Sequence, residues 1–183
     1  GRYDKEKRSV NNNVPGVASA LYYGGGTPIN PAMGAVGDII PSRDKSFDQF
    51  QPKISLTTSA ENTTVYASYG VGFRSGGFNS SGSAATTEFW LNSGNPFGLG
   101  VVGAGLGVSD TFKKEVSKSF EVGFKGRYLD GRLEVNGALF ETEVDDNQFF
   151  EFFAGPWGLL RVVTNIDQLD ISGSELDFKY AVS

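Results

Sequence analysis

The feature that most constrains the fold is a strict alternation of apolar and polar side chains. It is clearest over residues 115–128, where the positions between the apolar ones are charged, hydroxylated or glycine and Lys118 alone interrupts the apolar set. The apolar set is Val116, Phe120, Val122, Phe124 and Tyr128. A period of two is that of a β-strand, whose successive side chains point to opposite faces. This stretch therefore predicts a strand with one apolar and one polar face.

The same alternation recurs along the chain. It occupies residues 50–57, 65–73, 133–139 and 175–180, and the chain is predicted to begin within a further strand near residues 1–4. Matches to the helical period are poor throughout. The sequence thus predicts an all-β, antiparallel protein with about six strands.

The connections between these strands alternate in length. Short turns are predicted at residues 59–62 and at 129–131, where Asp130-Gly131 favours a tight hairpin because both residues tolerate positive φ. Long connections are predicted at 9–46, 75–112 and 149–160. Loops beyond about 12–15 residues are uncommon in compact soluble domains. Short turns alternating with long loops are typical of an outer-membrane β-barrel, which has short periplasmic turns and long extracellular loops.

Composition excludes several classes of function. The 183 residues carry 16 basic and 21 acidic side chains, a net charge of −5, which argues against a nucleic-acid partner. There is no Cys and no His, so thiolate zinc sites, cysteine nucleophiles and Ser-His-Asp triads are excluded. No apolar run is long enough for a transmembrane helix. We expect no catalytic residues, no metal ligands and no cofactor, and an enzyme is the least favoured interpretation.

Six strands are too few to close a membrane barrel. Barrels of the bacterial type have at least about eight strands, and an open sheet would expose unpaired backbone groups to hydrocarbon. We therefore expect residues 1–183 to be a partial β-barrel domain, an internal segment of a longer protein that does not fold alone.

Several motifs, in their order and spacing, resemble the later barrel strands of TonB-dependent outer-membrane receptors, over about three quarters of the chain, from Phe47 to Tyr180. The motifs are FQPK at 50–53, GVGFRSGGFN at 70–79, EVSKSFEVGFK at 115–125, DGRL at 130–133 and ISGSEL at 171–176. The resemblance implies a barrel of about 22 strands, an N-terminal plug and energy supplied through TonB. The plug, the TonB-contacting segment and the closing strand are not among these residues.

The resemblance also implies a function and partners. The expected function is active uptake across the bacterial outer membrane of a bulky, scarce nutrient, of the siderophore-iron, cobalamin or oligosaccharide class. The expected partners are outer-membrane lipid, a small-molecule or chelate ligand, and the TonB complex through the absent plug.

Two sets of candidate site residues follow. Polar side chains predicted to line the lumen in a structural role are Glu121, Lys125, Arg127, Glu134 and Glu175. Arg74 is opposite in phase to Phe73 and should also point inward, where it could pair with a carboxylate such as Glu121 or, less favoured, contact a ligand.

An aromatic cluster supplies the other candidates, and its members are Phe149, Phe150, Phe152, Phe153 and Trp157. Aromatic rings on an outer loop can stack on a sugar, a planar siderophore or a cobalamin ring. They can equally form an outer girdle at the membrane surface or pack the loop closed, and the residues alone favour these two structural interpretations.

Two alternatives to the receptor segment remain open on the sequence. One is a soluble or surface-exposed β-sandwich that binds carbohydrate through the aromatic loop. The other is a small standalone barrel that serves as a passive pore or adhesin.

Overall fold

The computed structural model describes residues 1–11, 22–23, 27–28, 41–92, 107–155 and 158–182. The long strands are β1 (Arg2–Val10), β4 (Arg43–Gln51), β5 (Lys53–Ala60), β6 (Thr63–Arg74), β9 (Glu115–Tyr128), β10 (Leu133–Gly155) and β11 (Gly158–Tyr180). The short elements are β2 (Tyr22–Tyr23), β3 (Thr27–Pro28), β7 (Gly77–Phe78), β8 (Thr111–Phe112), the α-helix α1 (Ser83–Thr87) and a π-helical turn, η3 (Glu88–Asn92).

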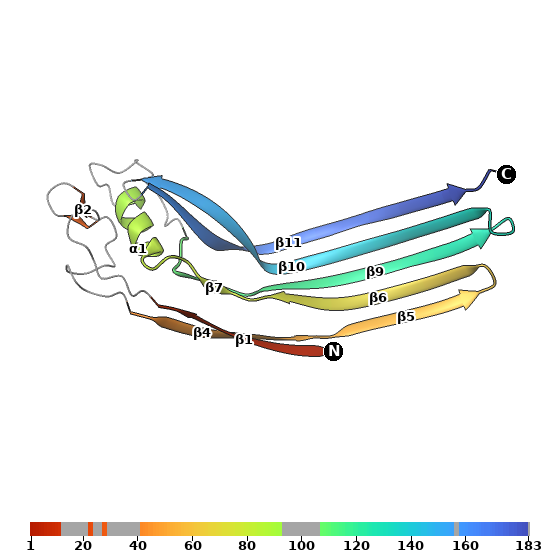
Figure 1. The fold of residues 1–183 in the computed structure, drawn as a ribbon, viewed down its shortest axis with the longest axis horizontal. Helices are drawn as coiled ribbons and strands as arrows, with labels where there is room; N and C mark the ends of the chain where they lie inside the picture. The colour runs from red at the N-terminus through yellow and green to blue at the C-terminus, as the bar shows by residue number, and fades with distance from the viewer. Residues whose placement is uncertain (12–21, 24–26, 29–40, 93–106, 156–157, 183) are drawn as a thin grey trace.

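The long strands form one antiparallel succession in which chain neighbours are sheet neighbours. The central sheet has the order β11-β10-β9-β6-β5, and β1 pairs with β4. Strands β4 and β5 follow one another along a single line, interrupted at Pro52, which has no N–H to donate to a ladder (Figure 1). Counted as one, they bring the number of long strands to six, so the predicted strand plan is confirmed.

The two ends of the sheet differ, as the connection lengths predicted. The β5–β6 and β9–β10 turns lie together at one end, here called the turn end, and α1 and β2 lie at the other, the loop end (Figure 1). The β9–β10 turn has φ of 55° at Leu129, 56° at Asp130 and 84° at Gly131, so the positive φ expected of the Asp-Gly pair is present.

One predicted loop is wrong. Residues 149–160 were expected to be a long connection, but β10 continues as strand to Gly155 and β11 resumes at Gly158. Only residues 156–157 separate the two strands, which pair as far as Gly155 with Gly158. The third connection is therefore a hairpin that extends the sheet rather than a loop.

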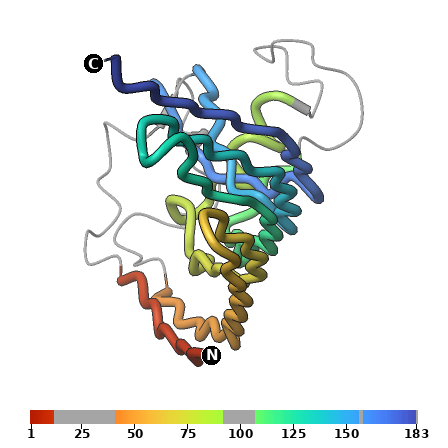
Figure 2. Tube along the Cα trace, turned by 90° about the vertical axis from the view of Figure 1, so that its right-hand side faces the viewer, coloured from red at the N-terminus to blue at the C-terminus, as the bar shows by residue number. Residues whose placement is uncertain are grey.

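Seen along the strands, the sheet curves into an open arc and does not close on itself (Figure 2). This is the geometry of a segment of a β-barrel wall. Among the described residues no second sheet packs across the apolar face of the central sheet, as a sandwich would require, and the six long strands do not close a barrel. The sandwich and the small standalone barrel are therefore not supported.

The strand register separates two faces of the central sheet. Cross-strand partners lie on the same face, and one continuous face, the apolar face, carries side chains that are largely exposed. They include Ile54, Leu56, Val65, Tyr69, Phe120, Phe124, Leu139, Leu176, Phe178 and Tyr180. The buried apolar side chains of the described residues lie elsewhere, chiefly towards the loop end: Phe47, Trp90, Leu91, Val144 and Val162. No helix among the described residues is long and apolar enough to cross a membrane.

Aromatic rings lie over glycines at three successive strand pairs. Tyr66 is paired with Gly123, Phe124 with Gly137, and Phe140 with Gly173. A side chain on Gly123 would begin 2.6 Å from Oη of Tyr66 and 2.7 Å from the backbone oxygen of Gly137. Because backbone cannot move aside cheaply, this glycine is required by close approach, and the ring covers the space that it leaves.

We expect Gly123→Ala to destabilise the barrel by about 1–3 kcal/mol, because the added methyl group would overpack this contact. Gly70→Ala is the matched control, since its nearest neighbour in the same sheet would be Cγ of Lys53 at 3.9 Å. Thermal unfolding of the full-length protein in detergent measures the difference. Equal stability of the two variants would contradict the close-approach explanation.

Candidate functional site

The polar face of the central sheet gathers all five side chains that were predicted to line the lumen. The register places Glu121, Lys125 and Arg127 of β9 on the same face as Glu134 of β10 and Glu175 of β11. Arg127 Nη2 lies 2.7 Å from Glu134 Oε1, and Lys125 Nζ lies 5.9 Å from the centre of the Tyr66 ring. The face is thus polar but internally paired, as expected of a structural, hydrated wall.

A hollow of about 460 Å³ opens on this face at the turn end. Its lining combines the β5–β6 turn with charged side chains of β9 and β10: Glu61, Asn62, Thr64, Lys125, Gly126, Arg127, Glu134 and Asn136. Both signs of charge are present, so the hollow favours neither anions nor cations.

Arg74 pairs with a different carboxylate from the one suggested by the sequence. Its direct cross-strand partner is Glu115, and the two side chains lie 3.9 Å apart. Glu121 lies opposite Ser68 instead, so the expected pairing with Glu121 is wrong, because the sequence does not determine register. The Arg74 side chain remains 65% exposed, which leaves its guanidinium accessible at the loop end of β6.

The aromatic cluster lies on β10 rather than on a loop, and Trp157 is outside the described residues. Phe150 and Phe152 are 48% and 56% exposed, with ring centres 5.8 Å apart in an edge-to-face arrangement. The guanidinium of Arg161 lies 4.7 Å from the centre of the Phe150 ring. The stacked pair Phe149–Phe150 has a separation of 5.9 Å. These residues present an exposed aromatic surface with one cation.

The position of this surface weighs against a girdle at the membrane border. On β10 the apolar face ends at Leu139 and continues as Glu141, Glu143 and Asp145. Phe149 lies ten residues beyond Leu139, about 33 Å along a strand. Aromatic girdles adjoin the apolar band. Of the three roles considered for these rings, packing of the hairpin and ligand binding therefore fit their position better than a girdle.

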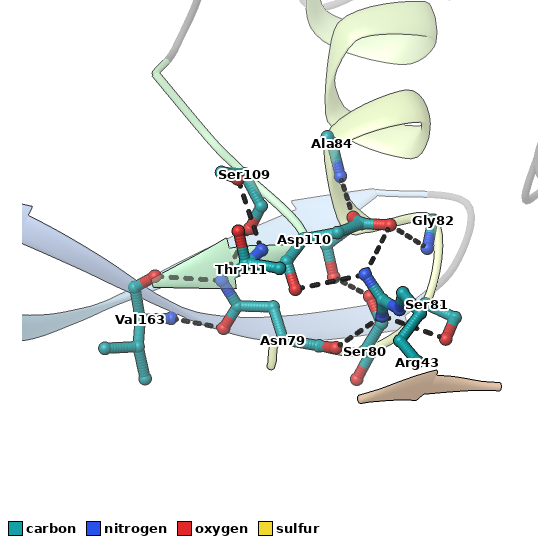
Figure 3. Close-up of polar contacts among 11 residues, drawn as sticks. Arg43, Asn79, Ser80, Ser81, Gly82, Ala84, Ser109, Asp110, Thr111 and Val163 are labelled. Atoms are coloured by element: carbon teal, nitrogen blue, oxygen red, sulfur yellow. Dashed lines mark hydrogen bonds and ion pairs between the residues drawn. The ribbon is translucent and has the colours of Figure 1, made fainter. Parts of the chain in front are cut away.

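A polar network that no sequence pattern indicated lies at the loop end, centred on Asp110 and Asn79 (Figure 3). Asp110 accepts hydrogen bonds from the backbone N–H groups of Gly82 and Ala84, both at 2.9 Å, at the start of α1. Its carboxylate lies 3.4 Å from Nη1 of Arg43 on β4. Arg43 also donates to the Ser81 hydroxyl at 3.1 Å and stacks 5.2 Å from the Phe78 ring.

Asn79 joins this network to β11. It is only 6% exposed. Its Nδ2 donates to the carbonyl oxygens of Ser109 and Val163, at 2.7 and 2.8 Å, and its Oδ1 accepts from the Val163 N–H at 2.7 Å (Figure 3). These contacts join residues 30 and 84 positions apart, which is why no local pattern indicated them. The network holds the described parts of the β6–β9 connection, residues 79–84 and 109–110, against each other and against β11.

Residues 1–182 match the family described as "TonB dependent receptor-like, beta-barrel". Among solved structures, the copper transporter OprC is similar over 99% of this chain and 24% of its own, with 17% identity and a TM-score of 0.53. The ferric-catecholate import receptor Fiu from E. coli K12 is similar over 99% of this chain and 23% of its own, with 19% identity and a TM-score of 0.46.

The Serratia marcescens hemophore receptor HasR, solved as a double mutant with its hemophore HasA and heme, is similar over 98% of this chain and 28% of its own, with 18% identity and a TM-score of 0.47. The chain therefore spans about a quarter of the length of the solved structures that it matches.

Asp110→Asn should loosen the β6–β9 connection. The amide has the size of the carboxylate but carries no charge opposite Arg43. Its NH2 group would also replace one of the two oxygens that accept from the Gly82 and Ala84 N–H groups, so that two hydrogen-bond donors would face each other. We expect faster protease cleavage within residues 79–92 of the full-length protein. Asp130→Asn, in a turn at the other end of the sheet, is the control. Cleavage at the wild-type rate in Asp110→Asn would show that the network does not hold the connection.

Proposed function

The chain belongs to the TonB-dependent receptor β-barrel family, and from this premise we propose that it forms part of the wall of a receptor for active uptake of a bulky, scarce nutrient across the outer membrane of a Gram-negative bacterium. The observation that carries the proposal is the division of the central sheet into a continuous apolar face and an internally paired polar face. We therefore assign the chain to transport and recognition rather than to catalysis.

The apolar face is the surface that we assign to outer-membrane lipid. On β6 its side chains run from Val65 to Phe73, nine residues, close to the 9–11 residues with which a tilted strand crosses hydrocarbon. The turn end then faces the periplasm and the loop end the outside, because barrels of this class keep their short turns on the periplasmic side.

The polar face is the surface that we assign to the lumen. Glu121, Lys125, Arg127, Glu134 and Glu175 would form its structural lining, in contact with water and with a plug that lies outside this chain. We assign energy coupling through TonB to that plug and to no residue of the 183.

Two places at the loop end are suited to ligand contact. Arg74 offers an exposed guanidinium where β6 leaves the apolar band, and Phe150 and Phe152 offer exposed rings beside Arg161. Rings and a stacked guanidinium favour a ligand with flat or anionic groups, which fits a siderophore chelate better than a neutral oligosaccharide. Because the ligand brings its own chelating groups, the absence of His and Cys in the chain is no obstacle to iron cargo.

Replacing Phe150 and Phe152 together by Ala should weaken uptake at limiting ligand concentration. Each lost stacking contact is expected to reduce apparent affinity by roughly tenfold at most. The experiment is growth and uptake in a strain that depends on the receptor, supplied in turn with ferric catecholates, ferric hydroxamates, cobalamin and oligosaccharides.

Phe120→Ala is the matched control, because Phe120 is as exposed as Phe150 but lies on the apolar face, away from the loop end. The proposed role predicts a raised half-saturating concentration with unchanged maximal uptake in the double variant. Unchanged uptake in the double variant, or an equal loss in Phe120→Ala, would contradict a binding role for the aromatic surface.

A further inference from the structure

The hairpin formed by β10 and β11 changes character at Asp146. Up to Asp145, which is paired with Val116, β10 is held by ladders on both sides, to β9 and to β11. Beyond this point, within the described part of the chain, it pairs only with β11. Residues 147–155 and 158–166, here called the outer hairpin, therefore form a two-stranded ribbon that continues the β10–β11 pair and that no backbone ladder joins to β9.

The chain bends at the same place. Asp146 has φ of 51°, a left-handed conformation that is uncommon for a residue other than glycine. The ladder to β11 skips it, running from Asp145–Gln168 directly to Asn147–Ile166. Both strands leave the direction of the sheet at the loop end (Figure 1). A break in the ladder at one residue is what a hinge requires, because the change of direction is absorbed there.

Side chains take over where the ladder stops. Asn79 exchanges two hydrogen bonds with the backbone of Val163, accepting from its N–H and donating to its carbonyl oxygen. Asn165 does the same for Lys113, accepting from its N–H at 2.8 Å and donating to its carbonyl oxygen at 3.2 Å. Each amide thus imitates the pair of bonds that two residues exchange in an antiparallel ladder.

Asp146, at the hinge, is itself held by two side chains, those of Lys113 and Asn165. Nζ of Lys113 lies 2.8 Å from Oδ1 of Asp146, and Nδ2 of Asn165 donates to the carbonyl oxygen of Asp146 at 2.7 Å. Hydrogen bonding to Asp146 raises the pKa of Lys113 above its ordinary value, so the lysine is charged at physiological pH. Gln148 adds donations from Nε2 to the carbonyl oxygens of Ser75 and Lys113, at 2.9 and 3.1 Å.

We propose that the outer hairpin is a flap that pivots at Asp146 and is latched to the β6–β9 connection by the side-chain amides of Asn79 and Asn165. A few side-chain bonds open far more readily than a continuous ladder, because each adds only a small net free energy. The flap would carry Phe150 and Phe152 with it, but the latch exists whatever ligand those rings contact. It therefore stands or falls separately from the uptake proposal.

Hydrogen–deuterium exchange of the full-length receptor in nanodiscs tests the latch. Asn79→Ala and Asn165→Ala should each accelerate exchange in the outer hairpin, by roughly tenfold or more, and leave residues 133–144 unchanged. The double variant should exchange faster than either. Asn136→Ala is the matched control, because the Asn136 amide donates to the Asp177 carboxylate, at 3.3 Å, on the same strand pair on the turn-end side of the hinge. It should leave the outer hairpin as slow as in the wild type.

A milder variant tests the latch if the alanine variants fail to assemble. Asn165→Asp, at a half-buried position beside Lys113, keeps an acceptor for the Lys113 N–H but loses the donations from Nδ2 to the carbonyl oxygens of Lys113 and Asp146, so exchange in the outer hairpin should rise by a smaller factor. The proposal is overturned if the outer hairpin exchanges at the wild-type rate in the latch variants. It is equally overturned if acceleration spreads through residues 133–144, since the hairpin would then not open as a separate unit.

Discussion

The rest of the structure depends on the pairing of backbone N–H and C=O groups along the long strands, which a backbone in hydrocarbon would require. The ladders that join β6, β9, β10 and β11 are uninterrupted from the turn end towards the loop end. The β6–β9 ladder reaches the pair Arg74–Glu115, and the β9–β10 ladder reaches the pair Val116–Asp145. Once the backbone is paired, the side chains divide by alternation alone. One face becomes apolar and the other polar, and the receptor interpretation follows from this division.

Outside the apolar band water can hydrogen-bond to the backbone, and side-chain contacts replace the backbone ladders. The β9–β10 ladder ends, and the side chains of Asn79, Asn165, Asp110 and Arg43 hold the loop end together. Such contacts hold the outer hairpin in place although no backbone ladder joins it to β9. The division between a rigid wall and a separately fastened outer hairpin follows from this change of support.

Much of the wall could be predicted from the sequence, because alternation is a local pattern and each strand carries it. The grouping of Glu121, Lys125, Arg127, Glu134 and Glu175 on one face followed directly from their phase. The sequence predicts a loop at 149–160 instead of a hairpin because aromatic residues occupy consecutive positions at 149–150 and 152–153 and hide the period of two. The partner of Arg74 and the Asn79–Val163 contact depend on register and on the bend at Asp146, which no local pattern specifies.

In the proposed receptor, one face of β9 meets lipid and the other meets water. Single nitroxide labels placed in turn at residues 119–125 of the full-length receptor, in outer membranes, distinguish the two faces. We expect alternation: labels at 120, 122 and 124 should be relaxed by oxygen dissolved in lipid, and those at 119, 121, 123 and 125 by a water-soluble nickel chelate. Equal accessibility to both reagents along the strand, or the opposite phase, would contradict it.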